Sequence, residues 1–203
     1  EGRAYFGAMN CAINIAFLNR QLIMHSVREV FADHFKKSPR ELGLRLIYDV
    51  CHNTAKLEHH EIDGKTRRLL VHRKGATRAF GPGMKGIPGR YTQHGQPVIV
   101  GGSMESGSYL CAGTASAAGT FYSTVHGSGR AMSRTQARKA FNGRELQQSL
   151  GSRGIHVRTA SFSGLAEEAG GAYKDIDAVV GAASAAGLSV PVARLKPVGN
   201  VKG

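Results

Sequence analysis

An uninterrupted apolar rhythm near the start of the chain constrains the fold more than any other sequence feature. Between residues 4 and 35 the spacing predicts a long helix, or two shorter ones, with a single apolar stripe. Ser38-Pro39 ends it. The chain enters this rhythm at once and without methionine, so we expect its N-terminus to be cut from something longer. The residues that carry the stripe recur at steps of three and four: Ala8, Cys11, Ile15, Leu18 and Leu22.

Beyond this helix the pattern mixes strands and helices without regular alternation. The composition predicts a glycine-rich loop over residues 81–96 and a helical stretch over 133–150 capped by Ser133. A further helical stretch is interrupted at Gly170 and Gly171. We therefore predict an α+β fold with mixed sheets, hairpins and flanking helices, and we find no linker that divides residues 1–203. The expected strands cover residues 44–50, 66–76 (a hairpin return after an Asp63-Gly64 turn), 98–100, 109–112 and 155–161, and one more near the C-terminus.

The charge balance indicates a polyanionic partner. Lys and Arg exceed Asp and Glu by 13, which favours nucleic acid over a membrane because no basic amphipathic helix stands out. No apolar run reaches the roughly 18 residues of a membrane span. Three cysteines lie far apart in sequence, a sparse set typical of a reducing compartment, so we expect a cytoplasmic protein.

The stretch TVHGSGRAMSR (Thr124 to Arg134) is the most suggestive local motif. Glycines 127 and 129 permit positive φ and close backbone approach beside His126. Arg130 and Arg134 are expected on the helix that follows, whose N-terminus adds partial positive charge. These features predict a phosphate site beside an imidazole, but spacing alone leaves a simple turn histidine equally possible.

Other candidates are weaker when taken singly. His52 follows an apolar strand but has no metal-ligand partner near it in sequence. The pair His59-His60 is interpreted as solvated, because adjacent residues on a strand face opposite ways. The remaining candidates are a basic turn at Lys74, a Gly/Ser turn with Ser103 and Ser108, a tyrosine at Tyr173 that offers a stacking face, and a C-terminal lysine, Lys202.

Five dispersed segments resemble, in this order and at these spacings, the C-terminal half of the RtcB-type RNA ligases. They are HRKGATRAF, GQPVIVGGSM, HGSGRAMSR, AYKDID and VARLKPVGNVKG, and the opening EGRAYFGAMNCAINIAFLNRQLI resembles the long helix that begins that half. The resemblance covers essentially the whole chain. It implies that residues 1–203 are the C-terminal half of a single RtcB-like ligase domain whose N-terminal, metal-binding half is not part of this sequence.

The resemblance also implies a chemistry. It is the GTP- and manganese-dependent joining of an RNA 3′-phosphate, or 2′,3′-cyclic phosphate, to a 5′-hydroxyl through a histidine guanylate, in tRNA splicing or RNA repair. His126 matches the guanylylated nucleophile, flanked by Gly127 and Gly129, and His52 matches a manganese-binding histidine. Ser103, Ser108, Tyr173 and Lys202 match nucleotide-binding positions, with Tyr173 packing on guanine. Lys74, Arg130 and Arg134 match residues that line the RNA or phosphate groove.

Two departures from the family pattern set the alternatives. Glu105 stands where the family turn has glycine, and a carboxylate beside a triphosphate is unfavourable unless it points away or pairs with an arginine. In the family that this chain resembles, most manganese ligands belong to the N-terminal half, so we expect that half, if it is encoded separately, to be a partner. The resemblance also implies RNA (tRNA halves or broken RNA) and an archease activator as partners. The alternative is a non-catalytic RNA-binding remnant, and a weaker one is the truncated product of a partial gene.

Overall fold

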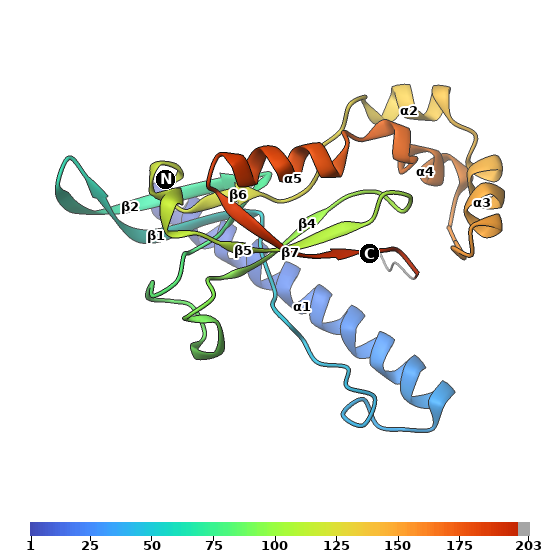
Figure 1. Ribbon diagram of the computed structural model, residues 1–203, viewed down its shortest axis with the longest axis horizontal. Helices are drawn as coiled ribbons and strands as arrows, with labels where there is room; N and C mark the ends of the chain where they lie inside the picture. The colour runs from blue at the N-terminus through green and yellow to red at the C-terminus, as the bar shows by residue number, and fades with distance from the viewer. Residues whose placement is uncertain (199–203) are drawn as a thin grey trace. The chain divides into compact units, whose positions relative to one another are not determined.

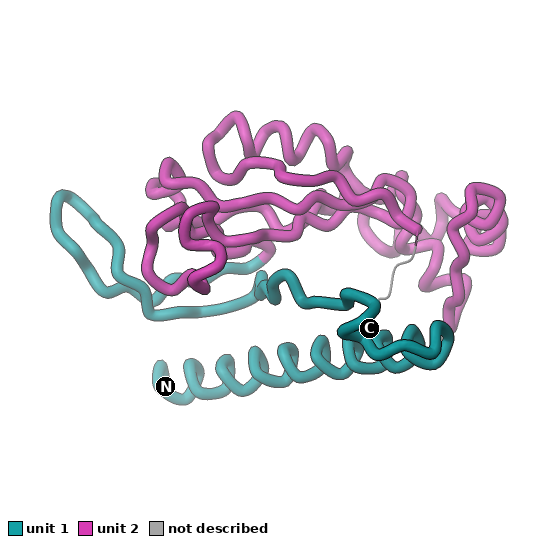
Figure 2. The backbone as a smooth tube through the Cα atoms, turned by 60° about the horizontal axis from the view of Figure 1, so that its bottom comes forward, with its two compact units in different colours: residues 1–74, 203 teal, residues 75–202 magenta. Residues whose placement is uncertain are grey.

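The computed structural model describes residues 1–198 and divides the chain into two compact units, residues 1–74 and a second unit that begins at Gly75 (Figure 2). Helices and small antiparallel sheets occur together, which confirms the predicted α+β class (Figure 1). Within residues 1–198, no helix combines the length and the hydropathy that a membrane span needs.

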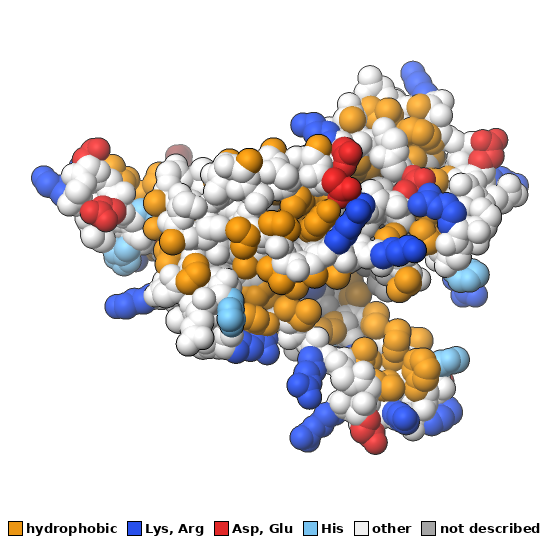
Figure 3. Space-filling model, in the orientation of Figure 1, with side chains coloured by type: hydrophobic (Ala, Val, Ile, Leu, Met, Phe, Trp, Pro, Cys, Tyr) orange, Lys and Arg blue, Asp and Glu red, His pale blue; other side chains and the backbone are white. Residues whose placement is uncertain are grey.

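The first unit opens with α1 (Gly2–Phe35), a single helix of 34 residues, so the predicted long helix is confirmed. Lys36 ends it in the left-handed conformation, with φ of 51°. None of its side chains is buried. Apolar side chains gather at the surface over the C-terminal part of α1, where Val30, Phe31 and Phe35 are exposed (Figure 3).

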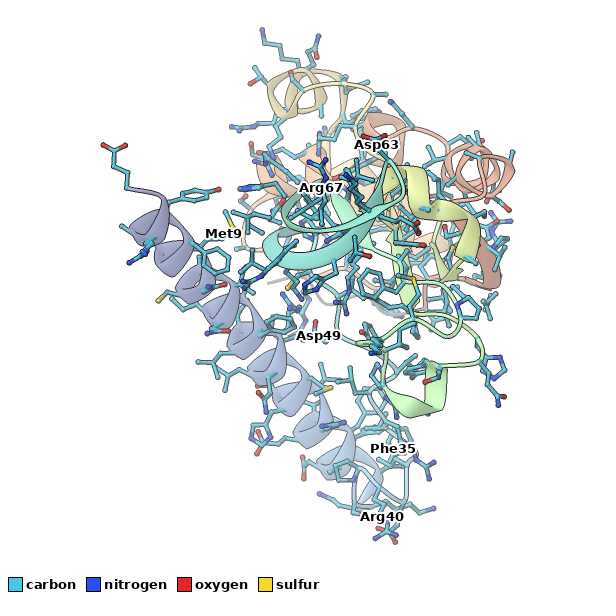
Figure 4. The ribbon with its side chains drawn as sticks, turned by 90° about the vertical axis from the view of Figure 1, so that its left-hand side faces the viewer. Met9, Phe35, Arg40, Asp49, Asp63 and Arg67 are labelled. Atoms are coloured by element: carbon cyan, nitrogen blue, oxygen red, sulfur yellow. The ribbon has the colours of Figure 1, made fainter. Side chains whose placement is uncertain are left out.

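Residues 44–51 return alongside α1 as irregular backbone, so the strand predicted over 44–50 is wrong. Side chains of the helix hold this segment: Arg28 Nη2 donates to Leu44 O at 3.1 Å, and Arg20 Nε donates to Asp49 Oδ1 at 2.6 Å. Figure 4 shows Asp49 in this segment and Met9 on the helix. An apolar run of this length is typical of a strand, but here arginines of the helix bind the segment, and a single sequence does not reveal such contacts.

The first unit ends in a long hairpin of β1 (Asn53–Ile62) and β2 (Lys65–Lys74), paired in register from Ile62↔Lys65 to Asn53↔Lys74. Asp63 and Gly64 form the two-residue turn with φ of 51° and 70°, the positive values that an Asp-Gly hairpin turn requires. The predicted hairpin return is therefore confirmed, although its first strand is 53–62.

The second unit is built around a three-stranded antiparallel sheet in the order β4-β5-β7, with a separate two-stranded β3-β6 pair. Helix α5 (Ile176–Ala185) lies alongside the larger sheet (Figure 1). Ile176 and Val180 pack there with Val98, Val100 and Cys111 to form the main core. The strands are β3 (Ala76–Arg78), β4 (Pro97–Gly101), β5 (Ser108–Gly113), β6 (Ser123–Val125) and β7 (Ser189–Leu195).

Short helices form a second core beside the sheet. The predicted helical stretch is two helices, because it breaks at Phe141 and restarts with Asn142 as a cap. Leu150 lies at the centre of this core with Met104, Ile155 and Leu165. Residues 155–161 contain no strand, so that prediction is wrong: Ile155 is buried in the cluster, and Gln147 Nε2 donates to Val157 O at 2.7 Å. The helices are α2 (Arg134–Ala140), α3 (Gly143–Ser152) and α4 (Phe162–Glu167), with 3₁₀ turns at Gly89–Tyr91, Ala115–Thr120 and Gly170–Ala172.

Candidate functional site

His126 follows β6 directly, and β6 pairs with β3 through Ala76↔Val125. This pairing brings the His126 ring to Gly75, where Nδ1 lies 2.6 Å from the carbonyl oxygen. A carbonyl oxygen only accepts hydrogen bonds, so Nδ1 carries the proton, and a neutral ring then has its lone pair on Nε2. Gly75 adopts φ of +66°, a conformation that favours glycine. The turn thus fixes the tautomer of the half-buried imidazole.

The Gly/Ser turn after β4 lies directly against the His126 turn. Gly101 N donates to His126 O at 3.2 Å, and Ser128 N donates to Gly101 O at 2.8 Å. A Cβ on Gly127 would lie 2.9 Å from that same Gly101 oxygen, so only glycine allows this approach without a shift. Two motifs that are distant in sequence are therefore in contact at the backbone level.

The serines predicted to bind nucleotide are engaged with the Gly/Ser turn itself. Ser103 is buried, and its Oγ accepts from the backbone N–H groups of Glu105 and Ser106, both at 3.1 Å. Ser108 is half-buried, and its Oγ accepts from Gly102 N at 3.4 Å. Ser103 thus shapes the turn in this structure, and nucleotide binding by either serine stays a prediction.

Glu105 pairs with an arginine, which is one of the two arrangements expected for a carboxylate in this turn. Arg153 Nη1 lies 3.3 Å from Glu105 Oε1, and Glu105 Oε2 accepts from Gly170 N at 2.5 Å. The carboxylate therefore anchors the 3₁₀ turn that leads to Tyr173.

Tyr173 is held by the last residue of the HGSGR motif. Its hydroxyl donates to Glu168 Oε2 at 2.7 Å and accepts from Arg130 Nη1 at 3.0 Å. The Arg130 guanidinium also lies over the ring, 4.8 Å from its centroid. Burial, and then the hydrogen bond to Glu168, raise the pKa of Tyr173 to about 12. The phenol therefore stays protonated throughout the physiological pH range.

The two arginines of the motif occupy different positions. Helix α2 begins at Arg134 with Ser133 as its cap, as the sequence predicted, and the structure adds a capping box between Ser133 and Gln136. Arg130 lies before this helix, so its predicted placement on the helix is wrong; its backbone bridges to Tyr173 instead. The Arg134 side chain is 69% exposed, with Nε 3.4 Å from Glu167 Oε2.

His52 and Lys74 lie together at one end of the first unit's hairpin. His52 immediately precedes β1, and Asn53 pairs with Lys74. Both residues line a groove of about 740 Å³ that is also bordered by Cys51 and the N-terminal half of α1. Within residues 1–198, no group of three or more His, Cys, Asp or Glu side chains could hold a metal ion. The described residues therefore do not fit a manganese centre by themselves, and Lys202 lies outside them.

Sequence reasoning missed a buried ionic cluster in the hairpin. Arg73 pairs with both carboxylate oxygens of Glu58 at 2.8 Å, and His60 Nε2 lies 2.9 Å from Glu58 Oε2. The prediction that His59-His60 is solvated is thus wrong for His60, which is buried, and correct for His59. The two-residue alternation of Glu58 and His60 on one strand face was the available signal.

Known proteins match this chain over its whole length, so the match includes all of these motifs. The family model described as "RtcB: tRNA-splicing ligase RtcB" matches residues 1–203. The chain belongs to the RtcB family. Curated RtcB relatives match the whole chain: that of Pyrococcus abyssi is 51% identical over 204 residues, and that of Methanococcus maripaludis is 50% identical over 204. The chain spans only 22% and 42% of the length of these two RtcB proteins.

Proposed function

We propose that this chain supplies the guanylate-accepting part of an RNA ligase that joins an RNA 3′-phosphate or 2′,3′-cyclic phosphate to a 5′-hydroxyl. The observation that carries the proposal is the hydrogen bond between His126 Nδ1 and the Gly75 carbonyl, which assigns the lone pair to Nε2. Family membership and the names of the RtcB relatives support an RNA ligase.

In the proposed first step, His126 Nε2 attacks the α-phosphorus of GTP. A P–N bond forms as the bond to the bridging oxygen breaks, and pyrophosphate leaves with the electron pair. The positive charge that develops on the ring is stabilised by the Nδ1–H bond to Gly75. Where the substrate is a 2′,3′-cyclic phosphate, water first hydrolyses it to the 3′-phosphate. An oxygen of the RNA 3′-phosphate then displaces the histidine, and the 5′-hydroxyl attacks the activated phosphorus, releases its proton to solvent and expels GMP.

The nucleotide site would be formed by the turns that meet at Gly101. Gly129, beside which no atom of residues 1–198 lies within 4 Å of a Cβ position, leaves room at the backbone for the α-phosphate, and Gly127 allows the close approach of Gly101 that shapes this turn. Tyr173 would pack on the guanine. Ser103, Ser108 and Lys202 complete the proposed nucleotide contacts.

The RNA would be bound through its phosphates. The net charge of +13 supports a polyanionic substrate, and we propose that Lys74 and Arg134 each contact RNA phosphates. Manganese would neutralise phosphate charge, with His52 as one ligand. Because the described residues do not complete a metal centre, we propose the N-terminal half of an RtcB ligase as the essential partner, acting in the cytoplasm on tRNA halves or broken RNA. An archease activator is a further expected partner.

The test is guanylate transfer after complementation. The chain is mixed with the remaining part of the Methanococcus maripaludis relative, Mn²⁺ and GTP labelled at the α-phosphate. We expect acid-labile label on this chain, none on His126→Ala, and unchanged label on His25→Ala, which alters an exposed histidine of α1. Undiminished labelling of His126→Ala would show that the nucleophile is misassigned.

The second candidate function is RNA binding without catalysis, favoured by the charge excess alone. It predicts an affinity for single-stranded RNA that falls steeply with salt and shows little sequence preference. Under this alternative, no label appears under any complementation.

A further inference from the structure

We propose that Arg130 is a positioning residue for Tyr173: it orients the phenol ring so that the base of a bound guanine nucleotide packs at a set place relative to His126. This inference rests on the proposed function, in which Tyr173 packs on guanine. Arg130 would act on the nucleotide indirectly, by orienting the Tyr173 ring on which the guanine packs. A direct phosphate contact is the competing role.

Three hydrogen bonds hold the Arg130 guanidinium against protein acceptors. Nε donates to Met132 O at 3.1 Å, and Nη2 donates to Glu167 O at 2.7 Å. Nη1 donates to the Tyr173 hydroxyl at 3.0 Å and lies 3.8 Å from Glu168 Oε1. One N–H on each nitrogen of the guanidinium is therefore bound to a protein acceptor, so three of its five donors hold the side chain against two backbone carbonyls and the Tyr173 hydroxyl.

Contact with the ring adds a second constraint. The guanidinium carbon lies 4.8 Å from the centroid of Tyr173, within the range of a cation–π interaction. The side chain of Arg130 is 24% exposed, so solvent screens this interaction only in part. One residue thus fixes both the tilt of the ring and the position of its hydroxyl.

The backbones of the two segments are also joined. Arg130 and Tyr173 form an antiparallel bridge, Ala131 N donates to Ala172 O at 2.9 Å, and Lys174 N donates to Gly129 O at 3.0 Å. His126 lies four residues before Arg130 in this same turn. The side-chain contact therefore extends a fixed backbone connection from the nucleophile turn to the base-packing ring.

Arg134 shows what an arginine available for phosphate looks like in the same motif. Its side chain is 69% exposed, and its Nε forms an ion pair with Glu167 Oε2 at 3.4 Å. Glu167 is shared with Arg138 at 2.8 Å. Within HGSGRAMSR, the phosphate role therefore suits Arg134 and the positioning role suits Arg130.

Arg130→Lys separates the two roles because it keeps the charge but loses the planar fork and its stacking. The matched control is Arg144→Lys, since Arg144 also lies over a ring, that of Phe162, at 4.9 Å, but is exposed and distant from the HGSGR motif in sequence. The first measurement is NMR of the full chain with ring-labelled tyrosine, the Tyr173 signal being assigned with Tyr173→Phe. We expect Arg130→Lys to shift this signal and speed ring flipping, and Arg144→Lys to leave it unchanged.

The second measurement is binding to the complemented ligase of two half-ligands: guanosine, which lacks phosphates, and tripolyphosphate, which lacks a base. We expect Arg130→Lys to lower the affinity for guanosine about tenfold, which is the size of a partly buried cation–π contact and hydrogen bond together. The affinity for tripolyphosphate should be unchanged. Tyr173→Leu should lower the affinity for guanosine by a similar factor, and the double variant should lose no more affinity than either single variant.

Either of two results would overturn the proposal: an unchanged Tyr173 signal in Arg130→Lys, or a loss of tripolyphosphate affinity with guanosine unaffected. If the Tyr173 signal responds as expected but the wild-type complex binds no guanosine and forms no histidine guanylate, the proposed function fails while the hold of Arg130 on Tyr173 stands.

Discussion

Helix α1 and the turns around His126 differ in what fixes them in place. The helix runs for 34 residues without one buried side chain, and its apolar stripe is open to solvent, with Ile15, Leu18 and Leu22 at 67%, 54% and 55% exposure. The turns around His126 contain buried Ser103 and Ser128 and are joined to one another by backbone hydrogen bonds. Short segments rich in glycine are thus the more strongly constrained of the two regions.

This difference extends to the two histidines of the proposed site. His126 has its tautomer set by a carbonyl of its own unit, whereas His52 lies at a hairpin end without a complete ligand set among residues 1–198. His126 is therefore oriented by a contact within its own unit. Residues 1–198 hold no group of three or more His, Cys, Asp or Glu side chains that would complete a metal site around His52.

We expect the largest difference in stability when leucine is replaced by alanine in the core of the second unit and on the exposed stripe of α1. Leu150→Ala removes a fully buried side chain from the second core and should lower the free energy of unfolding by about 3 kcal/mol. Leu22→Ala, on the exposed stripe, should change it by less than about 0.5 kcal/mol. Urea unfolding followed by circular dichroism measures both, and equal losses would mean that the stripe of α1 is as well packed as the core.

Substitution of either glycine beside His126, Gly127 or Gly129, by alanine should lower the free energy of unfolding, but for different reasons. Gly127→Ala brings a Cβ to 2.9 Å from Gly101 O and should cost about 2 kcal/mol, because backbone must shift. Gly129→Ala meets no atom within 4 Å but must hold φ near +71°, a strain of about 1 kcal/mol. Urea midpoints in the reverse order would show that conformational strain outweighs the close approach.

Much of the first unit could be predicted from the sequence because its signals are local. The three- and four-residue rhythm specified α1, and Asp63-Gly64 specified the hairpin turn, since these patterns need no knowledge of distant residues. The segment 44–50 was mispredicted for the opposite reason: Arg20 and Arg28 of α1 bind it, and an apolar run does not reveal such partners.

In the candidate site, residue identities were predictable but their contacts were not. The motif HGSGR pointed to His126, yet its tautomer depends on a carbonyl 51 residues away. The same holds for the pairing of Arg130 with Tyr173, 43 residues on, and of Glu105 with Gly170, 65 residues on. Such contacts follow from the assembled fold, which a single sequence does not specify.

A capping residue tests how far the local connections near His126 stabilise the second unit. Ser133 Oγ accepts from Gln136 N, and Gln136 Oε1 accepts from Ser133 N in return. Ser133→Ala should therefore cost about 1 kcal/mol, measured by urea unfolding. Ser133→Asp keeps an N-cap acceptor and should restore most of the loss; failure of aspartate to do so would mean that the serine acts by some means other than capping.

The smallest effect is a pH dependence that distinguishes the core from the exposed helix. Burial raises the pKa of the Cys111 thiol from 9.0 to about 11, so the folded state holds a proton that the unfolded chain releases. This contribution to stability is complete below pH 9 and is lost as pH rises towards 11. Between pH 9 and 10 the unfolding free energy should fall by less than about 1 kcal/mol, and Cys111→Ala should flatten that slope relative to Cys11→Ala, which alters an exposed thiol of α1.

Thiol alkylation at pH 8 gives a second measure of the same difference, with Cys11 reacting quickly and Cys111 slowly. Equal alkylation rates would show that the core around Cys111 opens as readily as the surface of α1.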